Sequence, residues 1–287
     1  MRKRSSPTTA ARIPSAPDRK YGRHRERICG EVHSRLNLRL DISYDGSYFH
    51  GFASQPSLTT VQGEIDAALS RLLRVQEIES TGAGRTDAGV HALGQVMSVG
   101  EVGDETDLEK LRAALNSVLG GRIAVRACIR ADPGFHARFS ARSRLYVYAI
   151  LQSDVPDPFL ARTALWHRKE LSVDAMNEAA GHLVGERDFS SFGRVPAGAS
   201  AQRTLFELSC SRDNSIVRIR ARANAFIQQM VRSLVGTLIQ VGEGKRAPDE
   251  AAGVLQARDR VKAGPVAPPH GLCLVSVEYD EGWSRPI

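Results

Sequence analysis

The sequence predicts an α/β fold in which helices cover one face of a sheet and leave the other face open. Predicted strands and predicted helices follow one another along the chain, with short connections. The strands show alternating apolar and polar residues, as in half-buried strands, and the helices show helical periodicity. With 287 residues, the chain can build one large domain or two modest ones with a substantial core. No apolar run could span a bilayer and no secretion signal is evident, so we expect a cytoplasmic protein.

The first half of the predicted fold begins with an alternating strand. Apolar residues from Leu36 to Tyr44 all face one side of that strand, which predicts half burial. A helix should follow, with Thr60 as its N-cap and a buried stripe from Val61 to Leu73. The remaining expected elements of this half are a small-residue loop, a strand over 95–99, a helix over 108–119 and a strand over 122–130.

A second half is expected after the proline-rich connection at 154–158, which neither a helix nor a central strand would tolerate. Its helices are predicted over 173–184 and 226–241, and its strands over 205–212, 216–223 and 272–279. No internal sequence repeat is visible. We therefore divide the globular part into an N-terminal α/β half, 36–153, which contains the loop, and a C-terminal α/β half, 154–287.

The net charge of +7 comes from one end of the chain. Residues 1–35 contain ten Lys or Arg and three acidic residues, 10 − 3 = +7, whereas the rest has 29 of each sign. This segment has few apolar residues, so we predict a basic, disordered N-terminal arm that could extend electrostatic contact with a polyanion. An inert tail, a misassigned start codon or an organelle transit peptide are the alternatives.

Neither the cysteines nor the histidines form a metal-binding pattern. The four cysteines lie far apart without a C-x-x-C pair, and the eight histidines show no H-x-x-x-H spacing. We therefore expect no metal site and no disulfide framework.

A loop of small residues, 83–92, contains the strongest candidate for chemistry. Asp87 stands there beside Arg85, between Gly84 and Gly89, which allow tight turning and close approach of a ligand. Arg85 could hold Asp87 ionised or contact an anionic substrate. This pattern predicts a positioned catalytic acid, and its alternative is an Asx turn in which Asp87 bonds only its own backbone.

The same loop resembles the signature loop of the TruA family of tRNA pseudouridine synthases. Nine contiguous residues, 84–92, match, and further blocks follow the family's order over roughly residues 36–280. These blocks are 44–46, 135–141, 188–189, 223–226, 230–232 and 271–272.

The resemblance implies a fold, a reaction and a set of site residues. The fold would be two ferredoxin-like halves that share an extended antiparallel sheet with flanking helices and a central cleft. The reaction would convert uridine to pseudouridine at positions 38, 39 and 40 of the tRNA anticodon stem-loop, without a cofactor, in a homodimer. Asp87 would be catalytic, Tyr146 would stack on the target base, and Leu272 would line the uracil pocket. Arg232 would lie against the catalytic carboxylate, although helical periodicity alone favours a solvated arginine there.

Arginines on predicted strands are candidates for further RNA contacts. Arg218, Arg220 and Arg222 share one strand face, Arg122, Arg126 and Arg130 share another, and Arg144 aligns with Tyr146 and Tyr148. Guanidinium groups beside aromatic rings suit phosphate contact and base stacking. Taken alone, each row is better explained by a solvated sheet face, and only its combination with the Asp87 loop favours RNA.

The residues leave the mechanism open. Asp87 could attack C1′ or C6 of the target nucleotide, or take the 2′ proton as a base. The alternative functions are an inactive tRNA-binding or tRNA-folding module and, less favoured, a nucleotide hydrolase that would release uracil.

Overall fold

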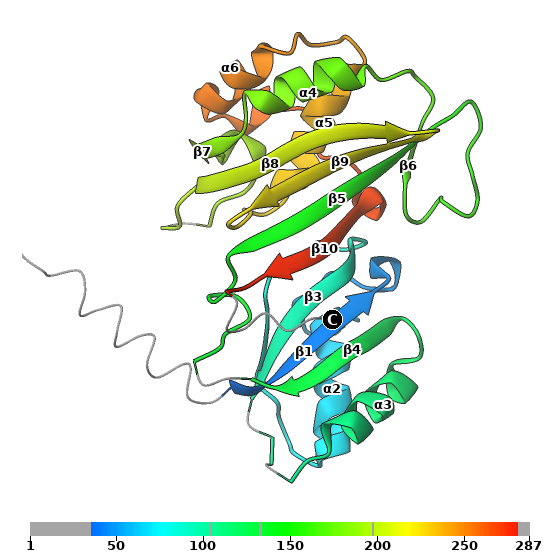
Figure 1. Ribbon diagram of the computed structural model, residues 1–287, viewed down its shortest axis with the longest axis vertical. Helices are drawn as coiled ribbons and strands as arrows, with labels where there is room; N and C mark the ends of the chain where they lie inside the picture. Colours follow the sequence, from blue (N-terminus) through cyan, green and yellow to red (C-terminus); the bar gives the residue numbers. More distant parts are fainter. Residues whose placement is uncertain (1–35, 101, 104, 132–133, 197, 281–287) are drawn as a thin grey trace, which may run out of the picture.

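The computed structural model describes residues 36–100, 102–103, 105–131, 134–196 and 198–280. The predicted basic arm, 1–35, lies outside these residues. The described chain forms one twisted sheet of ten strands with helices gathered at its two ends (Figure 1), which confirms the predicted α/β class. The main path of the sheet runs in the order β4-β1-β3-β10-β5-β9-β8-β7, while β2 pairs with β3 and β6 with β5.

Nearly all strand pairs are antiparallel. The two parallel pairs are β10 with β3 and β5 with β6. The strands are β1 Leu36–Tyr44, β2 Ser80–Gly82, β3 His91–Gly100, β4 Ile123–Arg130, β5 Ser143–Gln152, β6 Leu165–His167, β7 Gly185–Asp188, β8 Gln202–Asp213, β9 Ile216–Ala223 and β10 Leu272–Glu278. Because β10 comes from the end of the chain and lies between β3 and β5, both predicted halves share one continuous sheet. The division between residues 153 and 154 stays a prediction.

The helices form two groups. Those of the first group, near β1 and β4, are α2 Val61–Leu73 and α3 Leu108–Leu119; those of the second, near β8 and β9, are α4 Val173–Gly181, α5 Met230–Gly242 and α6 Glu250–Ala257 (Figure 1). Short 3₁₀ turns lie at Gly46–Tyr48, Ser190–Phe192, Arg260–Lys262 and Pro269–Gly271. Thr60 caps α2 as predicted, because its side-chain oxygen accepts a hydrogen bond from Gly63 N at 3.3 Å.

The main core lies between the helices and one face of the sheet. It runs along the whole sheet, from Leu115 of α3 through Leu40 of β1 and Tyr148 of β5 to Val254 of α6. A second, smaller cluster includes Phe135 and other residues that pack under the opposite face; its buried members are Ala83, Val96, Phe135, Ala137 and Tyr279. Apolar contact on both faces therefore fixes the centre of the sheet, where the 83–92 loop begins.

Several predicted boundaries were wrong. The helix expected over 226–241 begins only at Met230, because Gln229 takes a left-handed conformation with φ of 65°. The strand expected over 95–99 already begins at His91, since it also pairs with β10. In β4 a register shift buries Cys128 in place of Ile129, so the predicted alternation fails there. Three short strands and α6 were not anticipated; these strands are β2, β6 and β7.

Candidate active site

The loop that contains Asp87 is held by its own backbone and by buried polar side chains. Tyr44 and Thr86 share a buried hydrogen bond of 2.8 Å between their hydroxyl groups. The amide of Gln95 donates to the carbonyl of Gly84 at 2.7 Å. Gly89 has φ of 80°, a conformation that favours glycine. These contacts fix the conformation of the loop before any ligand binds.

A second segment packs backbone to backbone against the loop. The amide of Phe52 donates to the carbonyl of Thr86 at 3.0 Å. Gly51 has φ of 102°, and a Cβ there would lie 3.2 Å from the same carbonyl oxygen. A Cβ on Gly46 would lie only 2.0 Å from the carbonyl oxygen of Val90. Glycine at both positions therefore lets segment 46–52 brace the loop.

Asp87 forms an ion pair with Arg232. The distance from Nη1 of Arg232 to Oδ2 of Asp87 is 2.8 Å, and these side chains are 14% and 25% exposed. Arg232 also donates from Nε to the carbonyl of Ala267 at 2.7 Å, which fixes the direction of the guanidinium group. Arg85 is exposed and forms no ion pair within the described part of the chain. The arginine that pairs with Asp87 is therefore the one from α5, and not Arg85 of its own loop.

Arg232 is itself fixed by close packing around α5. Its carbonyl accepts a hydrogen bond from Ala267 N at 3.0 Å. A Cβ on Gly236, one turn along the helix, would lie 1.8 Å from the carbonyl oxygen of Pro265, so this segment runs directly along α5. The hydroxyl of Tyr148 donates to the carbonyl of Pro268 at 2.9 Å and closes the segment at its other end.

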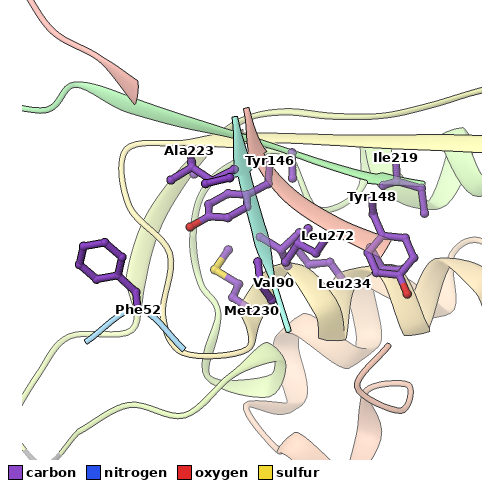
Figure 2. Packing of buried hydrophobic residues seen from close by; sticks show 14 of the residues in the cluster. Phe52, Val90, Tyr146, Tyr148, Ile219, Ala223, Met230, Leu234 and Leu272 are labelled. Carbon is purple, nitrogen blue, oxygen red and sulfur yellow. The ribbon is translucent and has the colours of Figure 1, made fainter. Parts of the chain in front are cut away.

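Tyr146 and Leu272 form an apolar wall beside this ion pair. Tyr146 and Tyr148 project from β5 toward Met230 and Leu234 of α5, with Leu272 of β10 near them (Figure 2). The ring of Tyr146 meets Phe226 edge-on, with centroids 5.2 Å apart. Burial raises the pKa of Tyr146, so the phenol is neutral. Together these residues offer an uncharged surface next to a carboxylate.

The hydroxyl of Tyr146 points to the loop that contains Asp87. A Cβ on Gly84 would lie 3.6 Å from that oxygen. Tyr146 donates no hydrogen bond to a described residue. The structure therefore brings together four of the predicted site residues, Asp87, Tyr146, Arg232 and Leu272, and leaves Arg85 at the exposed rim.

Arg144 has a role that sequence reasoning missed. Its side chain is buried, and its nitrogens donate to four backbone carbonyls, those of Ala83, Arg138, Ala141 and Asn224, at 2.6–3.3 Å. Burial lowers the pKa of this guanidinium group. The prediction of a phosphate contact at Arg144 was wrong. The sequence feature that indicates this burial is the alternation of Arg144 with Tyr146 and Tyr148, which places all three side chains on the buried face of β5.

The predicted arginine rows are occupied by contacts within the protein. Arg218 pairs with Asp213 at 3.1 Å and Arg220 with Glu207 at 2.9 Å, on the sheet face away from α5. Arg222 lies 3.8 Å from the same Glu207. In the second row, a glutamate or backbone carbonyls hold the side chains of Arg122, Arg126 and Arg130. The solvated-face interpretation therefore describes the first row, and β8 supplies acids that the sequence did not place.

The histidines of the matched blocks serve structure. His91 accepts from Gly46 N at 3.1 Å and His136 accepts from Arg138 N at 3.2 Å, and both are buried. Among the described residues, no three His, Cys, Asp or Glu side chains gather as a metal site. Within the same ranges, no helix is long and apolar enough to cross a membrane. Two hollows of about 220 and 340 Å³ lie elsewhere, and Asp87 lines neither.

Comparison with known proteins covers most of the chain. A family model described as tRNA pseudouridine synthase matches residues 42–140 and 179–280. A tRNA pseudouridine synthase A from Frankia casuarinae is 46% identical over 247 residues, which are 85% of this chain and 89% of that protein. The enzyme of the same name from Brevibacillus brevis is 44% identical over 243 residues, 84% of this chain and 99% of that protein.

Similarity to solved structures is weak by comparison. A Cbf5-Nop10-Gar1 complex aligns with a TM-score of 0.31 and 15% identity, over 74% of this chain and 47% of that one. A TM-score of this size does not establish a shared fold. The sequence matches do establish the family, because they span both matched segments and include the Asp87 loop, Tyr44 and Arg232. The chain belongs to the tRNA pseudouridine synthase family, whose members are isomerases that act on tRNA.

Proposed function

We propose that this chain converts uridine to pseudouridine at positions 38, 39 and 40 of the tRNA anticodon stem-loop, with Asp87 as its single catalytic carboxylate. The observation that carries the proposal is the ion pair of Asp87 with Arg232, 2.8 Å long, beside the apolar wall of Tyr146 and Leu272. A charge-assisted hydrogen bond from a largely buried arginine orients the carboxylate. The target positions rest on the resemblance of the 84–92 loop and its companion blocks to the TruA family.

The arrangement suits an isomerisation in which the uracil base stays in the site throughout. The bond from C1′ to N1 breaks, the uracil turns, and C5 bonds to C1′; C5 loses a proton and N1 gains one, so atoms and electrons balance. Because nothing is oxidised, reduced or added, the proposal includes no cofactor. Asp87 acts as the nucleophile at C1′ or C6, or as the base for the 2′ proton. Tyr146 stacks on the uracil while Leu272 limits its pocket.

Arg85 takes the role of a phosphate contact in this proposal. Its side chain is exposed at the rim of the loop, two residues from Asp87, and it forms no ion pair within the described residues. A free guanidinium group there can bind the backbone of an extruded nucleotide. Extrusion costs a few kcal/mol, which phosphate and stacking contacts can offset.

The replacement Asp87→Asn tests the proposal. It keeps the shape of the side chain and removes its charge, so we expect no detectable pseudouridine while tRNA affinity stays within a few fold. Product is mapped by carbodiimide treatment and primer extension on an unmodified tRNA transcript. The matched control is Asp213→Asn, which also removes an arginine-paired carboxylate, but on the sheet face away from α5.

Three outcomes of this experiment contradict parts of the proposal. Turnover by Asp87→Asn would remove Asp87 from the mechanism. Wild-type protein that binds tRNA without forming pseudouridine would support the inactive tRNA-binding module. Free uracil among the products would support the hydrolase.

The target positions need a separate test. Anticodon stem-loop transcripts with a single uridine at position 38, 39 or 40 should each be modified, whereas a transcript with its only uridine elsewhere in the loop should not. Modification of that last transcript at a comparable rate would contradict the assignment of positions.

We also propose that the protein is a homodimer, as the resemblance implies. The segment between β5 and β6 exposes two large apolar side chains, Val155 and Phe159, and Phe159 is 94% exposed. Such side chains are commonly covered in an assembly. Sedimentation should give twice the chain mass, and Phe159→Asp should lower it to one. A monomeric wild-type protein at micromolar concentration would contradict this proposal.

A further inference from the structure

Phe139 is an exposed aromatic residue that follows a buried stretch of chain. Its side chain is 66% exposed, whereas Phe135, His136 and Ala137 just before it are almost fully buried. The ring is therefore accessible to a binding partner from solvent. None of the contacts that place Asp87, Tyr146 or Arg232 uses this ring.

The ring is held in place from behind. The imidazole of His136 lies against it, with ring centroids 4.4 Å apart and planes tilted by 37°. The backbone N–H groups of Arg138 and Phe139 both donate to Nδ1 of His136, at 3.2 and 3.3 Å. Ser140 closes the turn, because its N–H donates to the carbonyl of His136 at 2.9 Å. One face of Phe139 is therefore presented by a preorganised turn, which lowers the entropic cost of binding.

The same turn is tied to the catalytic loop through Arg144. One guanidinium group donates to the carbonyl of Arg138 at 2.6 Å and to the carbonyl of Ala83 at 2.9 Å. Ala83 begins the loop that contains Asp87. The carbonyls of Arg138 and Ala83 thus share one donor, which places the turn of Phe139 beside the start of this loop.

Arg138 places positive charge beside the ring, and Arg203 lies near Arg138. Nη1 of Arg203 donates to the carbonyls of Ser200 and Gln202, at 2.9 and 2.6 Å. The guanidinium carbon of Arg138 lies 5.6 Å from the centroid of Phe139. Arg203 is close enough to Arg138 that, after burial, the like charge lowers the pKa of Arg203. Within the described residues neither arginine forms an ion pair, and Nε of Arg203 is buried without a hydrogen bond. This contrasts with Arg220 and Arg222, which share Glu207.

We propose that Phe139 is a stacking platform for an unpaired tRNA base next to the target nucleotide, and that Arg138 and Arg203 bind the adjoining phosphates. An exposed aromatic ring with guanidinium groups beside it is a typical surface for single-stranded RNA. Two unpaired cations favour a polyanion over an apolar protein partner. The inference rests on the proposed function, because it assumes a tRNA anticodon loop in the site.

The main test is Phe139→Leu, with Phe206→Leu as its matched control. Phe206 is also exposed and also has an arginine over its ring, Arg222 at 5.3 Å, but it lies on the sheet face away from α5. Loss of one stacked base corresponds to a change of roughly 5- to 150-fold. We expect KM for tRNA to rise by that factor in Phe139→Leu with kcat nearly unchanged, Phe139→Trp to restore KM, and Phe206→Leu to match wild type.

A readout without turnover separates this inference from the proposed function. Anticodon stem-loops with 2-aminopurine at each unpaired loop position in turn should show, at one position, fluorescence quenched by wild type and by Phe206→Leu but not by Phe139→Leu. Arg138→Gln should reduce the slope of log affinity against log salt by about 0.7 to 0.9. Equal KM and equal quenching in the two leucine variants would overturn the inference. Absence of pseudouridine with wild type would instead overturn the proposed function.

Discussion

The two helical layers contribute to the site in different ways. In the N-terminal layer, α2 and α3 cover β1 and β4, and Asp87 lies on a loop that backbone hydrogen bonds and close glycine contacts hold. In the C-terminal layer, the cation stands in the first turn of α5, a helix with most of its residues buried and no side-chain cap at its start. Loop geometry positions Asp87, whereas helix packing positions Arg232.

The sheet joins these layers weakly at its middle. Parallel pairing of β3 with β10 involves only Cys273 with His91 and Leu274 with Ala92. By contrast, β1 and β3 pair along almost their full length. The Asp87–Arg232 ion pair and the hydrogen bonds of Arg144 therefore reinforce a short junction. Docking of the two layers, rather than either layer alone, therefore creates the site.

Removal of the cation from this junction should have the largest effect. In Arg232→Met, Asp87 loses the guanidinium group that orients it, so we expect kcat to fall at least 100-fold and the free energy of unfolding to fall by about 1–3 kcal/mol, less than for a fully buried pair. Activity assays and urea unfolding measure both. In a double-mutant cycle with Asp87→Asn, the stability losses should not add. Additive losses would show that the two layers are not coupled through this pair.

Arg144→Lys should have the next largest effect. One ammonium group cannot reach the four carbonyls that the guanidinium group satisfies, and each buried carbonyl left without a donor costs about 1–3 kcal/mol. We expect a loss of stability of about 2–3 kcal/mol and a clear fall in activity, measured by thermal unfolding and product mapping. Arg142→Lys, at an exposed pair with Asp280, is the control and should change little. Equal effects of the two changes would contradict the inference that Arg144 holds these carbonyls together.

Substitution of Tyr146 sharpens the comparison within the apolar wall. Its hydroxyl donates no hydrogen bond to a described residue, so Tyr146→Phe should change kcat/KM by only a few fold. Tyr146→Leu removes the ring and should cost roughly 5- to 150-fold if stacking dominates. Single-turnover assays on one anticodon stem-loop compare the two. Equal losses would point to the hydroxyl instead of the ring.

Replacement of Asp66 should have the smallest effect, and it concerns the N-terminal layer alone. Burial raises the pKa of this α2 carboxyl to about 6, against a hydrogen bond from Ser80 that lowers it. The folded state therefore binds more protons between about pH 4 and pH 6, and the free energy of unfolding should fall as the pH rises through this window. Asp66→Asn should flatten this fall and add roughly 1–2 kcal/mol at pH 8 after allowance for screening.

Urea unfolding of wild type and Asp66→Asn at pH 4 and pH 8 measures this difference. Activity per folded molecule should stay the same, since Asp66 lies outside the junction. A stability gain that is equal at both pH values would contradict the titration of Asp66, and a loss of activity would connect α2 to the site.

Local patterns in the sequence determined most of the long elements and singled out the Asp87 loop. Alternation over Leu36–Tyr44 and the stripe behind Thr60 specify a strand and a capped helix because neighbouring residues suffice to define which side is buried. Asp87 between glycines is likewise recognisable from a segment of ten residues. The resemblance of ordered blocks added Tyr146, Arg232 and Leu272 as candidates. Asp87, Tyr146, Arg232 and Leu272 lie together in the structure.

Tertiary structure alone decided which charges meet. Asp87 and Arg232 are 145 residues apart, and only docking of α5 against the loop makes Arg232, not Arg85, the partner. Burial of Arg144 among carbonyls and pairing of Arg220 with Glu207 depend in the same way on which strands and loops pack together. Periodicity records which face of an element is apolar. It carries no record of which element will lie across that face, and that second choice sets the partners of Asp87 and Arg144.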